Sequence, residues 1–152
     1  MMIIDTRHSV SVAGVVIDEE NRALLIQRRD NSHWEPPGGV LELSESIEDG
    51  VRREVFEETG LAVDPIALTG VYKNIKRGIV ALVFKCRIVE GSLRENAEVR
   101  TFHWATRDDV LAMTSEAFAV RILDALDSPG HPAVRLHDGV HLVLAAPAMP
   151  SL

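Results

Sequence analysis

The pattern of hydrophobic and polar positions predicts an alternation of short strands and a few helices. β-Branched and apolar residues over 9–17 predict a strand, and the polar stretch 18–21 separates it from a second strand at 23–26. The further predicted strands are 66–75, 79–89, 99–105, 134–137 and 140–144. The first two of these should form a hairpin around 76–78, and the last two a closing hairpin around Asp138-Gly139, which is a strong turn dipeptide.

One helix is predicted by several independent signals over residues 46–59. Ser46 suits the N-cap position, and Gly60 supplies a C-terminal stop. Ile47, Val51 and Val55 recur every four residues, a spacing that places them on one face of a helix and toward a core. Two more helices are predicted at 107–113 and 116–126.

Residues 33–43 interrupt this regular pattern. The run Pro36-Pro37-Gly38-Gly39 removes backbone donors and favours unusual backbone angles, so we expect an irregular loop there. Strands outnumber helices and one helix interrupts the strand series, which predicts an α/β or α+β class with a mixed sheet. The length of 152 residues predicts a single domain over 1–152, with 128–152 as a C-terminal hairpin and tail extension.

Composition and charge exclude several classes of protein. The chain has 16 basic and 23 acidic residues, a net charge of −7, which argues against a general nucleic-acid binder. No apolar run approaches the roughly 20 residues of a membrane helix, and the N-terminus lacks the features of a signal peptide. Cys86 is the only cysteine, so no internal disulfide forms. We therefore expect a cytoplasmic protein that does not bind membranes.

Three carboxylates are concentrated on the predicted helix. At 100° per residue, Glu54, Glu57 and Glu58 fall within about a third of its circumference, beside the apolar stripe. Like charges this close repel each other unless a proton or a cation sits among them, and hard oxygen ligands suit Mg²⁺ or Mn²⁺. The alternative is a solvated acidic face with Arg52 and Arg53 as partners. Geometry along the sequence leaves both interpretations open.

The complete spacing around these residues resembles the Nudix box. It consists of Gly39, five residues, Glu45, seven residues, and then 53–61 with the sequence REVFEETGL. The preceding Trp34-Glu35-Pro36-Pro37-Gly38 is similar to the lead-in common in this family, and the likeness extends over about 9–111. Ser44 departs from the family, which commonly has glycine there, and this raises the question of the loop's backbone angle.

The resemblance implies a fold, a reaction and a set of site residues. It implies an α/β/α sandwich with a mixed sheet and the box on a loop-helix-loop. It implies hydrolysis of a nucleoside diphosphate linked to another group, with Mg²⁺ or Mn²⁺ held by Glu54, Glu57, Glu58 and the carbonyl of Gly39. Arg53 should pair with Glu45 or a neighbouring carboxylate and so hold the loop to the helix.

The general base is not fixed by the box. Glu98 is the leading candidate, because Glu98-Val99 followed by Trp104 resembles a recurrent family segment. Glu95 and Asp108 are weaker rivals, and Glu58 is an alternative inside the box. Glu98 beginning a strand at the surface, with no catalytic role, is the competing interpretation.

Candidate substrate contacts are basic side chains near predicted turns and strand ends. The candidates for phosphate binding are Arg28, with Arg29 beside it, and Lys73 and Arg77, with Lys76 between them. The aromatic residues that could stack on a base are Trp34, Tyr72, Phe84 and Phe102, although core positions are the more usual role for such residues. His131, His137 and His141 show no metal-binding spacing and are expected at the surface, whereas Cys86 is expected to be buried and inert.

These observations predict a metal-dependent hydrolase with a nucleotide-type substrate. Nucleoside triphosphates, ADP-ribose, nucleotide sugars and dinucleoside polyphosphates all remain open. Two alternatives are an isoprenoid diphosphate isomerase, whose cysteine and extra histidine ligands we do not find, and a non-catalytic Nudix-like nucleotide-binding module. An edge strand or the closing hairpin could pair two chains into a homodimer.

Overall fold

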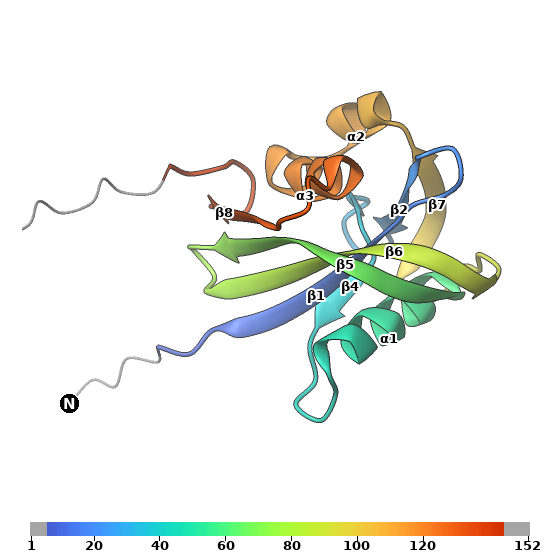
Figure 1. The fold of residues 1–152 in the computed structure, drawn as a ribbon, viewed down its shortest axis with the longest axis horizontal. Helices are drawn as coiled ribbons and strands as arrows, with labels where there is room; N and C mark the ends of the chain where they lie inside the picture. The colour runs from blue at the N-terminus through green and yellow to red at the C-terminus, as the bar shows by residue number, and fades with distance from the viewer. Residues whose placement is uncertain (1–5, 145–152) are drawn as a thin grey trace, which may run out of the picture.

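Two β-sheets form the centre of the computed structural model, which describes residues 6–144 (Figure 1). The strands are β1 (Ser9–Val16), β2 (Ala23–Arg28), β3 (Trp34–Glu35), β4 (Gly38–Val40), β5 (Leu61–Asn74), β6 (Ile79–Gly91), β7 (Val99–Ala105) and β8 (Ala133–His137). The helices are α1 (Ile47–Thr59), α2 (Arg107–Met113) and α3 (Glu116–Asp127). Most of the predicted elements are therefore present.

The larger sheet is mixed. Its strand order is β4-β1-β6-β5-β8, with β1 parallel to β6, β5 parallel to β8, and the other pairs antiparallel. The smaller sheet, β3-β2-β7, is antiparallel throughout. The predicted class, α and β elements around a mixed sheet, is confirmed.

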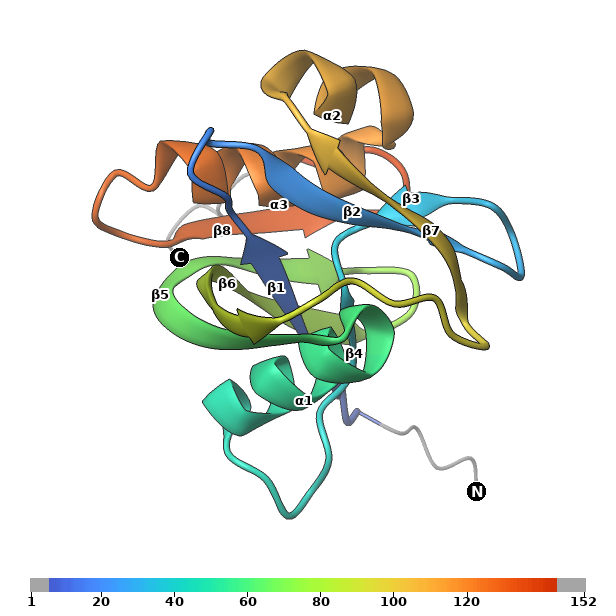
Figure 2. The same ribbon diagram turned by 90° about the vertical axis from the view of Figure 1, so that its right-hand side faces the viewer.

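Helices cover both faces of the larger sheet, with α1 on one side and α3 on the other, while α2 packs against α3 and β7 (Figure 2). Successive side chains of a strand point to opposite faces. Along β1, Val12 accordingly packs in one core cluster with Val55 of α1, and Ala13 packs in the other with Ile122 of α3. This alternation builds the predicted α/β/α sandwich.

The two ends of α1 are fixed by the residues that the sequence indicates. The Ser46 hydroxyl accepts a hydrogen bond from the Asp49 backbone N–H at 3.1 Å. Gly60 lies in the left-handed region, with φ of 84°, and its N–H donates to the Phe56 carbonyl. The apolar stripe is buried only in part, because Val51 and Val55 are fully buried whereas Ile47 remains 37% exposed.

The segment predicted to be an irregular loop contains two short strands instead. β3 pairs with β2, and in β4 Gly38 and Gly39 lie opposite Ala13 and Val12 of β1. Prolines stop regular structure only at 36–37, whereas the glycines keep their N–H groups and can join a sheet. A Cβ on Gly38 would lie 2.5 Å from the Val12 carbonyl oxygen, so the absence of a side chain permits this close pairing.

The prediction of a closing hairpin is wrong for its second strand, residues 140–144. β8 forms and pairs in parallel with β5, but residues 140–144 form no strand; their contacts with β8 are an isolated bridge, Leu142 with His137, and a hydrogen bond from the Val143 N–H to the Leu136 carbonyl. The segment also contacts the start of α3, where the Ala117 N–H donates to the Val140 carbonyl and Glu116 accepts from the Leu142 N–H. The rest of the predicted tail, 145–152, lies outside the described residues.

Within residues 6–144, no helix is long and apolar enough to cross a membrane.

Candidate active site

A cavity of about 640 Å³ lies where the last turns of α1 face β4 and the loop before β7. Its lining residues are Arg28, Arg29, Asp30, Gly38, Gly39, Glu54, Glu57, Glu58, Ala97 and Glu98. One cavity therefore contains the three helix carboxylates, Gly39 of the box and the candidate base Glu98. Glu98 was predicted from a different part of the sequence than the other four.

The three carboxylates differ in exposure. Glu58 is 7% exposed and the Glu54 side chain 14%, so both lie at the edge of the buried face as predicted. The Glu57 side chain is 56% exposed, which places it nearer to solvent than the pattern suggested. Arg52 pairs with Asp49 and Asp64 and with none of the three. A solvated acidic face thus describes Glu57 but not the other two.

Burial raises the pKa of Glu58 to about 8. The nearby carboxylates of Glu54, Glu35 and Glu98 add to this rise, whereas the Gly38 N–H, which donates to Glu58 at 2.7 Å, opposes it. Burial also raises the pKa of Glu54, partly offset by Arg53. Both shifts have the sign expected for carboxylates that are buried first of all and that also lie near other carboxylates.

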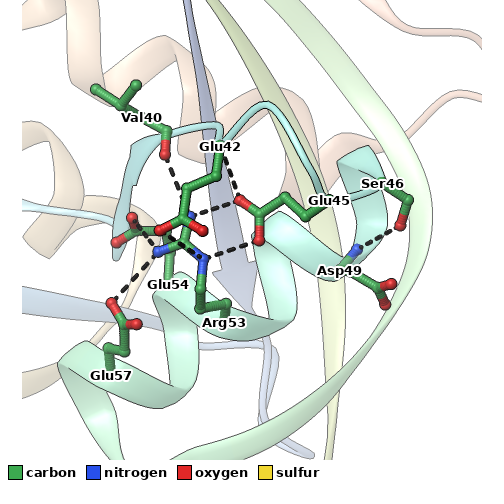
Figure 3. Close-up of polar contacts among 8 residues, drawn as sticks. All are labelled: Val40, Glu42, Glu45, Ser46, Asp49, Arg53, Glu54 and Glu57. Atoms are coloured by element: carbon green, nitrogen blue, oxygen red, sulfur yellow. Dashed lines mark hydrogen bonds and ion pairs between the residues drawn. The ribbon is translucent and has the colours of Figure 1, made fainter.

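Arg53 holds the box together (Figure 3). Its Nε and Nη2 donate to the two oxygens of Glu45 at 2.8 and 2.6 Å, which is the predicted pairing of loop and helix. Nη1 donates to Glu54 at 2.9 Å and Nη2 to the Val40 carbonyl at 3.2 Å. Hydrogen bonding to Arg53 holds the pKa of Glu45 at about 2. Arg53 therefore positions Glu54 and the preceding loop.

Gly39 lies directly against the Glu54 carboxylate. A Cβ at this position would come within 2.5 Å of Glu54 Oε1 and 2.7 Å of Oε2. The missing side chain thus leaves the backbone and the carboxylate face to face, and oxygen donors close together suit a hard divalent cation. As the side chains lie, no three His, Cys, Asp or Glu residues in 6–144 form a ready-made metal cluster. Glu54 is turned to Arg53 and Glu58 to Gly38.

The loop bearing Glu98 is held by Asn96, a residue that the sequence reasoning missed. The Asn96 side-chain oxygen accepts from the N–H groups of Glu98 and Val99, both at 3.0 Å, and its amide donates to the Glu58 carbonyl at 2.8 Å. Asn side chains often accept a hydrogen bond from the backbone N–H two residues further on, in an Asx-turn. This tendency is the sequence signal that could have indicated the role of Asn96. Asn96 therefore ties the candidate base to the end of α1.

The other candidate bases lie elsewhere. Glu95 makes an ion pair with Arg29 at 3.7 Å, and Asp108 lies in the first turn of α2. Neither lines this cavity.

The predicted substrate-binding cations are only partly brought together. Arg28 lines the carboxylate cavity and also a second cavity of about 520 Å³, while donating to Asp30 and Glu35. Arg77 lines the second cavity only, and Lys73 lines neither. The two cavities share Gly38 and Gly39 as well as Arg28, so they adjoin each other.

The aromatic residues lie where the sequence predicted, whereas one of the three histidines, His137, does not. Tyr72 and Phe84 are buried in the two core clusters, and Trp34 and Phe102 pack against them, which is the more usual role that we named. His137, expected at the surface, is 2% exposed, because it ends β8 beside α3 and contacts Arg121. Neither Phe118 nor Arg121, which both line the second cavity, was recognised from the sequence.

Comparison with known proteins agrees with the geometry. A model of the NUDIX domain family matches residues 7–126. The chain is 56% identical over 138 residues to a MutT-like protein of Streptomyces ambofaciens, covering 91% of this chain and 89% of that protein. It is 33% identical over 99 residues to an ADP-ribose pyrophosphatase of Methanocaldococcus jannaschii, covering 60% and 58% of the two chains.

Solved structures show the same fold. A NUDIX hydrolase from Nitrosomonas europaea superposes with a TM-score of 0.71 at 25% identity, over 83% of this chain and 93% of that one. An ADP-ribose pyrophosphatase from Streptococcus suis gives a TM-score of 0.71 at 23% identity, over 86% and 100%. The family match, the intact box and the fold agree, and the chain therefore belongs to the Nudix family of hydrolases.

Proposed function

We propose that the protein hydrolyses a phosphoanhydride bond in a nucleoside diphosphate linked to another group, using Mg²⁺ or Mn²⁺. The observation that carries this proposal is the single cavity where Glu54, Glu57 and Glu58 of the helix meet Gly39 and Glu98. A diphosphate is a dense anion that bare carboxylates would repel. The arrangement suits such a substrate only when cations lie between the two.

The residues that would hold the cation are Glu54, Glu57, Glu58 and the Gly39 carbonyl. Glu54 and Glu58 lie at the buried end of the cavity and Glu57 nearer to solvent. A bound divalent cation supplies charge neutralisation on the phosphate oxygens and lowers the pKa of water. Arg53 keeps Glu54 and the loop in place throughout, because it binds both at once.

Glu98 is the proposed general base. Its carboxylate lies on the same cavity as the three helix carboxylates, where it can accept a proton from the water that attacks phosphorus. Asn96 fixes the backbone on which Glu98 stands. Glu58 is the alternative base, since its raised pKa of about 8 is suited to proton transfer near neutral pH.

The other end of the substrate is expected to meet the arginines. Arg28 and Arg29 line the same cavity as the carboxylates and can donate to phosphate oxygens. Relatives named as ADP-ribose pyrophosphatases support a nucleotide-type substrate. Nucleoside triphosphates, nucleotide sugars and dinucleoside polyphosphates belong to the same proposal.

The proposal extends to the protein's setting. A single buried cysteine is in keeping with the reducing cytoplasm. The whole chain, 1–152, is proposed to form one domain with 128–152 as an extension, and the outer strands β4 and β8 of the larger sheet are the edges through which two copies could pair.

A panel of these compounds tests the proposal directly. We expect wild-type protein with Mg²⁺ to release phosphate, pyrophosphate or a nucleoside monophosphate from at least one of them. Glu57→Gln should lower turnover at least about 10²-fold, because several kcal/mol of charge stabilisation is lost at 1.36 kcal/mol per tenfold. Glu48→Gln is the matched control, an exposed glutamate in the first turn of the same helix. Turnover by Glu57→Gln equal to that of the control would contradict the assignment.

A further inference from the structure

Arg121 carries a buried charge that makes no direct ion pair with a carboxylate among residues 6–144, although Glu35 lies near enough to act on it electrostatically. The residue is 9% exposed, and its Nε is buried with no hydrogen-bond partner. Its guanidinium lies over the rings of Phe118 and Tyr72, with Cζ 4.8 and 5.3 Å from the ring centroids. Asp124 on the same helix is already bound by the Tyr72 hydroxyl and by Arg135. Buried charges are normally paired, so this arrangement calls for an acceptor.

His137 faces Arg121 as a second donor. The His137 Nδ1 accepts from the Gly139 backbone N–H at 3.0 Å, so the proton of the neutral ring lies on Nε2. That Nε2 is 3.2 Å from Arg121 Nη2, and a guanidinium has no acceptor to offer. Burial lowers the pKa of His137, and the positive charge of Arg121 lowers it further, so the ring stays neutral. In this tautomer, assigned from the Gly139 hydrogen bond, the ring Nε2–H and the guanidinium are two N–H donors that face each other with no acceptor between them.

Both residues line the second cavity, which adjoins the carboxylate cavity at Gly38 and Gly39. The floor of the second cavity is a sheet face of small side chains, Ser11 and Ala13 of β1 and Ala81 of β6, which leaves room for a flat group. A substrate whose phosphates occupy the first cavity can place its next group here.

Glu35 adds an acceptor to the same space. It lines the second cavity, and its Oε1 is bound by Arg28 Nη1 at 3.2 Å. Lys76 and Arg77 also line this cavity and are able to meet a phosphate, but the wall formed by Arg121, His137 and Glu35 combines donors with a carboxylate acceptor. This wall complements a lactam, the –NH–C(=O)– unit, whose oxygen accepts and whose N–H donates. Guanine, hypoxanthine and uracil contain this unit, and adenine does not.

We propose that Arg121 and His137 select the base of the substrate, donating to the carbonyl edge of a lactam nucleobase while Glu35 accepts its ring N–H. This proposal deepens the nucleotide hydrolase function and depends on it for the placement of the phosphates. Arginine is the usual partner of the O6 and N7 acceptors of guanine, and a bidentate pair of this kind favours the matching base by about 5-fold to 150-fold. The expected preference is therefore on the order of tenfold or more.

Binding of monophosphates in metal-free buffer tests this separately from hydrolysis, because they contain no phosphoanhydride bond. We expect calorimetry to show inosine monophosphate binding wild-type protein about tenfold or more tightly than adenosine monophosphate. Arg121→Met should abolish that preference and leave the weaker binding of adenosine monophosphate unchanged. Its melting temperature should stay within a few degrees of wild type, since the loss of the contacts with the Phe118 and Tyr72 rings is offset by removal of a buried charge that has no ion pair.

Two further variants keep the test decisive. Arg107→Met is the matched control, because Arg107 is half-exposed, pairs with Asp127 and lines neither cavity. If Arg121→Met does not fold, Arg121→Lys retains the charge without the planar fork and should lose the preference instead. Equal binding of the two monophosphates by wild type would overturn the proposal. So would equal weakening of both by Arg121→Met, which would mean that Arg121 binds phosphate.

Discussion

Gly39→Ala is the change that tests the packing of the site most finely. The new Cβ would lie 2.5 Å from Glu54 Oε1, 2.6 Å from Cδ and 2.7 Å from Oε2. All three distances are shorter than 3.0 Å, the practical lower limit for contacts of a Cβ atom. The Glu54 carboxylate must therefore move by about 0.5 Å or more. Because the obstacle is the end of a flexible side chain, the fold can yield at little cost, whereas the proposed cation ligand is displaced.

The expected effect on catalysis is large relative to the effect on stability. A misplacement of about 1 Å can cost on the order of 10²-fold in rate. We therefore expect Gly39→Ala to lower metal-dependent turnover by about 10-fold to 10²-fold, with a melting temperature within a few degrees of wild type. Turnover on the best compound of the panel, together with thermal unfolding in metal-free buffer, measures both quantities.

The neighbouring glycine provides the matched control. In Gly38→Ala the new Cβ would meet the Val12 carbonyl oxygen at 2.5 Å and Ala13 Cα at 2.9 Å, which are backbone atoms of β1 that cannot swing aside. This variant should lose stability first, with a clearly lower melting temperature. Wild-type turnover and wild-type cation affinity in Gly39→Ala would refute the reasoning, because Glu54 would then not need its present place.

The remaining predictions concern protonation and the candidate base. In metal-free protein the free energy of unfolding should fall as pH rises from about 4.5 through 8, because buried Glu58 loses a proton that it holds more tightly when folded; Glu58→Gln should remove this slope in thermal unfolding. Cys86 is 1% exposed and burial raises its pKa to about 12, so iodoacetamide at pH 8 should label it only in denaturant, as read by mass spectrometry. Glu98→Gln should lower turnover about 10²-fold to 10⁴-fold with cation affinity unchanged, and unaltered turnover would pass the role to Glu58. Asn96→Ala should lower turnover about tenfold through the displaced Glu98 loop, and a wild-type rate would show that the loop holds itself.

Much of the fold could be predicted because local signals agreed with each other. The α1 helix has a capping serine, buried valines at four-residue spacing and a left-handed glycine, and each of these acts over a few residues. β4 was missed because it forms only by pairing with β1, which is distant in sequence. The adjacent prolines and glycines predict an irregular loop, although the two glycines keep the N–H groups that a strand needs. The second strand of the predicted closing hairpin is wrong because residues 140–144 divide their hydrogen bonds between β8 and the start of α3, a tertiary contact that the local turn signal does not reveal.

The candidate site divides in the same way. Glu54, Glu57, Glu58 and Arg53 lie on one helix, so their common placement follows from sequence spacing alone. The Arg121 and His137 pair joins a helix to the end of a strand, and both residue types usually lie at the surface, so apolar neighbours such as Ile122 do not by themselves indicate their burial. The distribution of hydrophobic residues predicts where a core forms. It does not predict which polar side chains are enclosed with it.

The central claim is that carboxylates of α1 hold a divalent cation, and titration with Mn²⁺ in the absence of nucleotide tests it most directly. Electron paramagnetic resonance or calorimetry should show saturable binding by wild-type protein and by Glu48→Gln. In Glu57→Gln and in Glu54→Gln we expect the affinity to fall about 10-fold or more, with helicity and melting temperature retained. Identical binding curves for all four proteins would contradict the account, because the ion would then lie elsewhere.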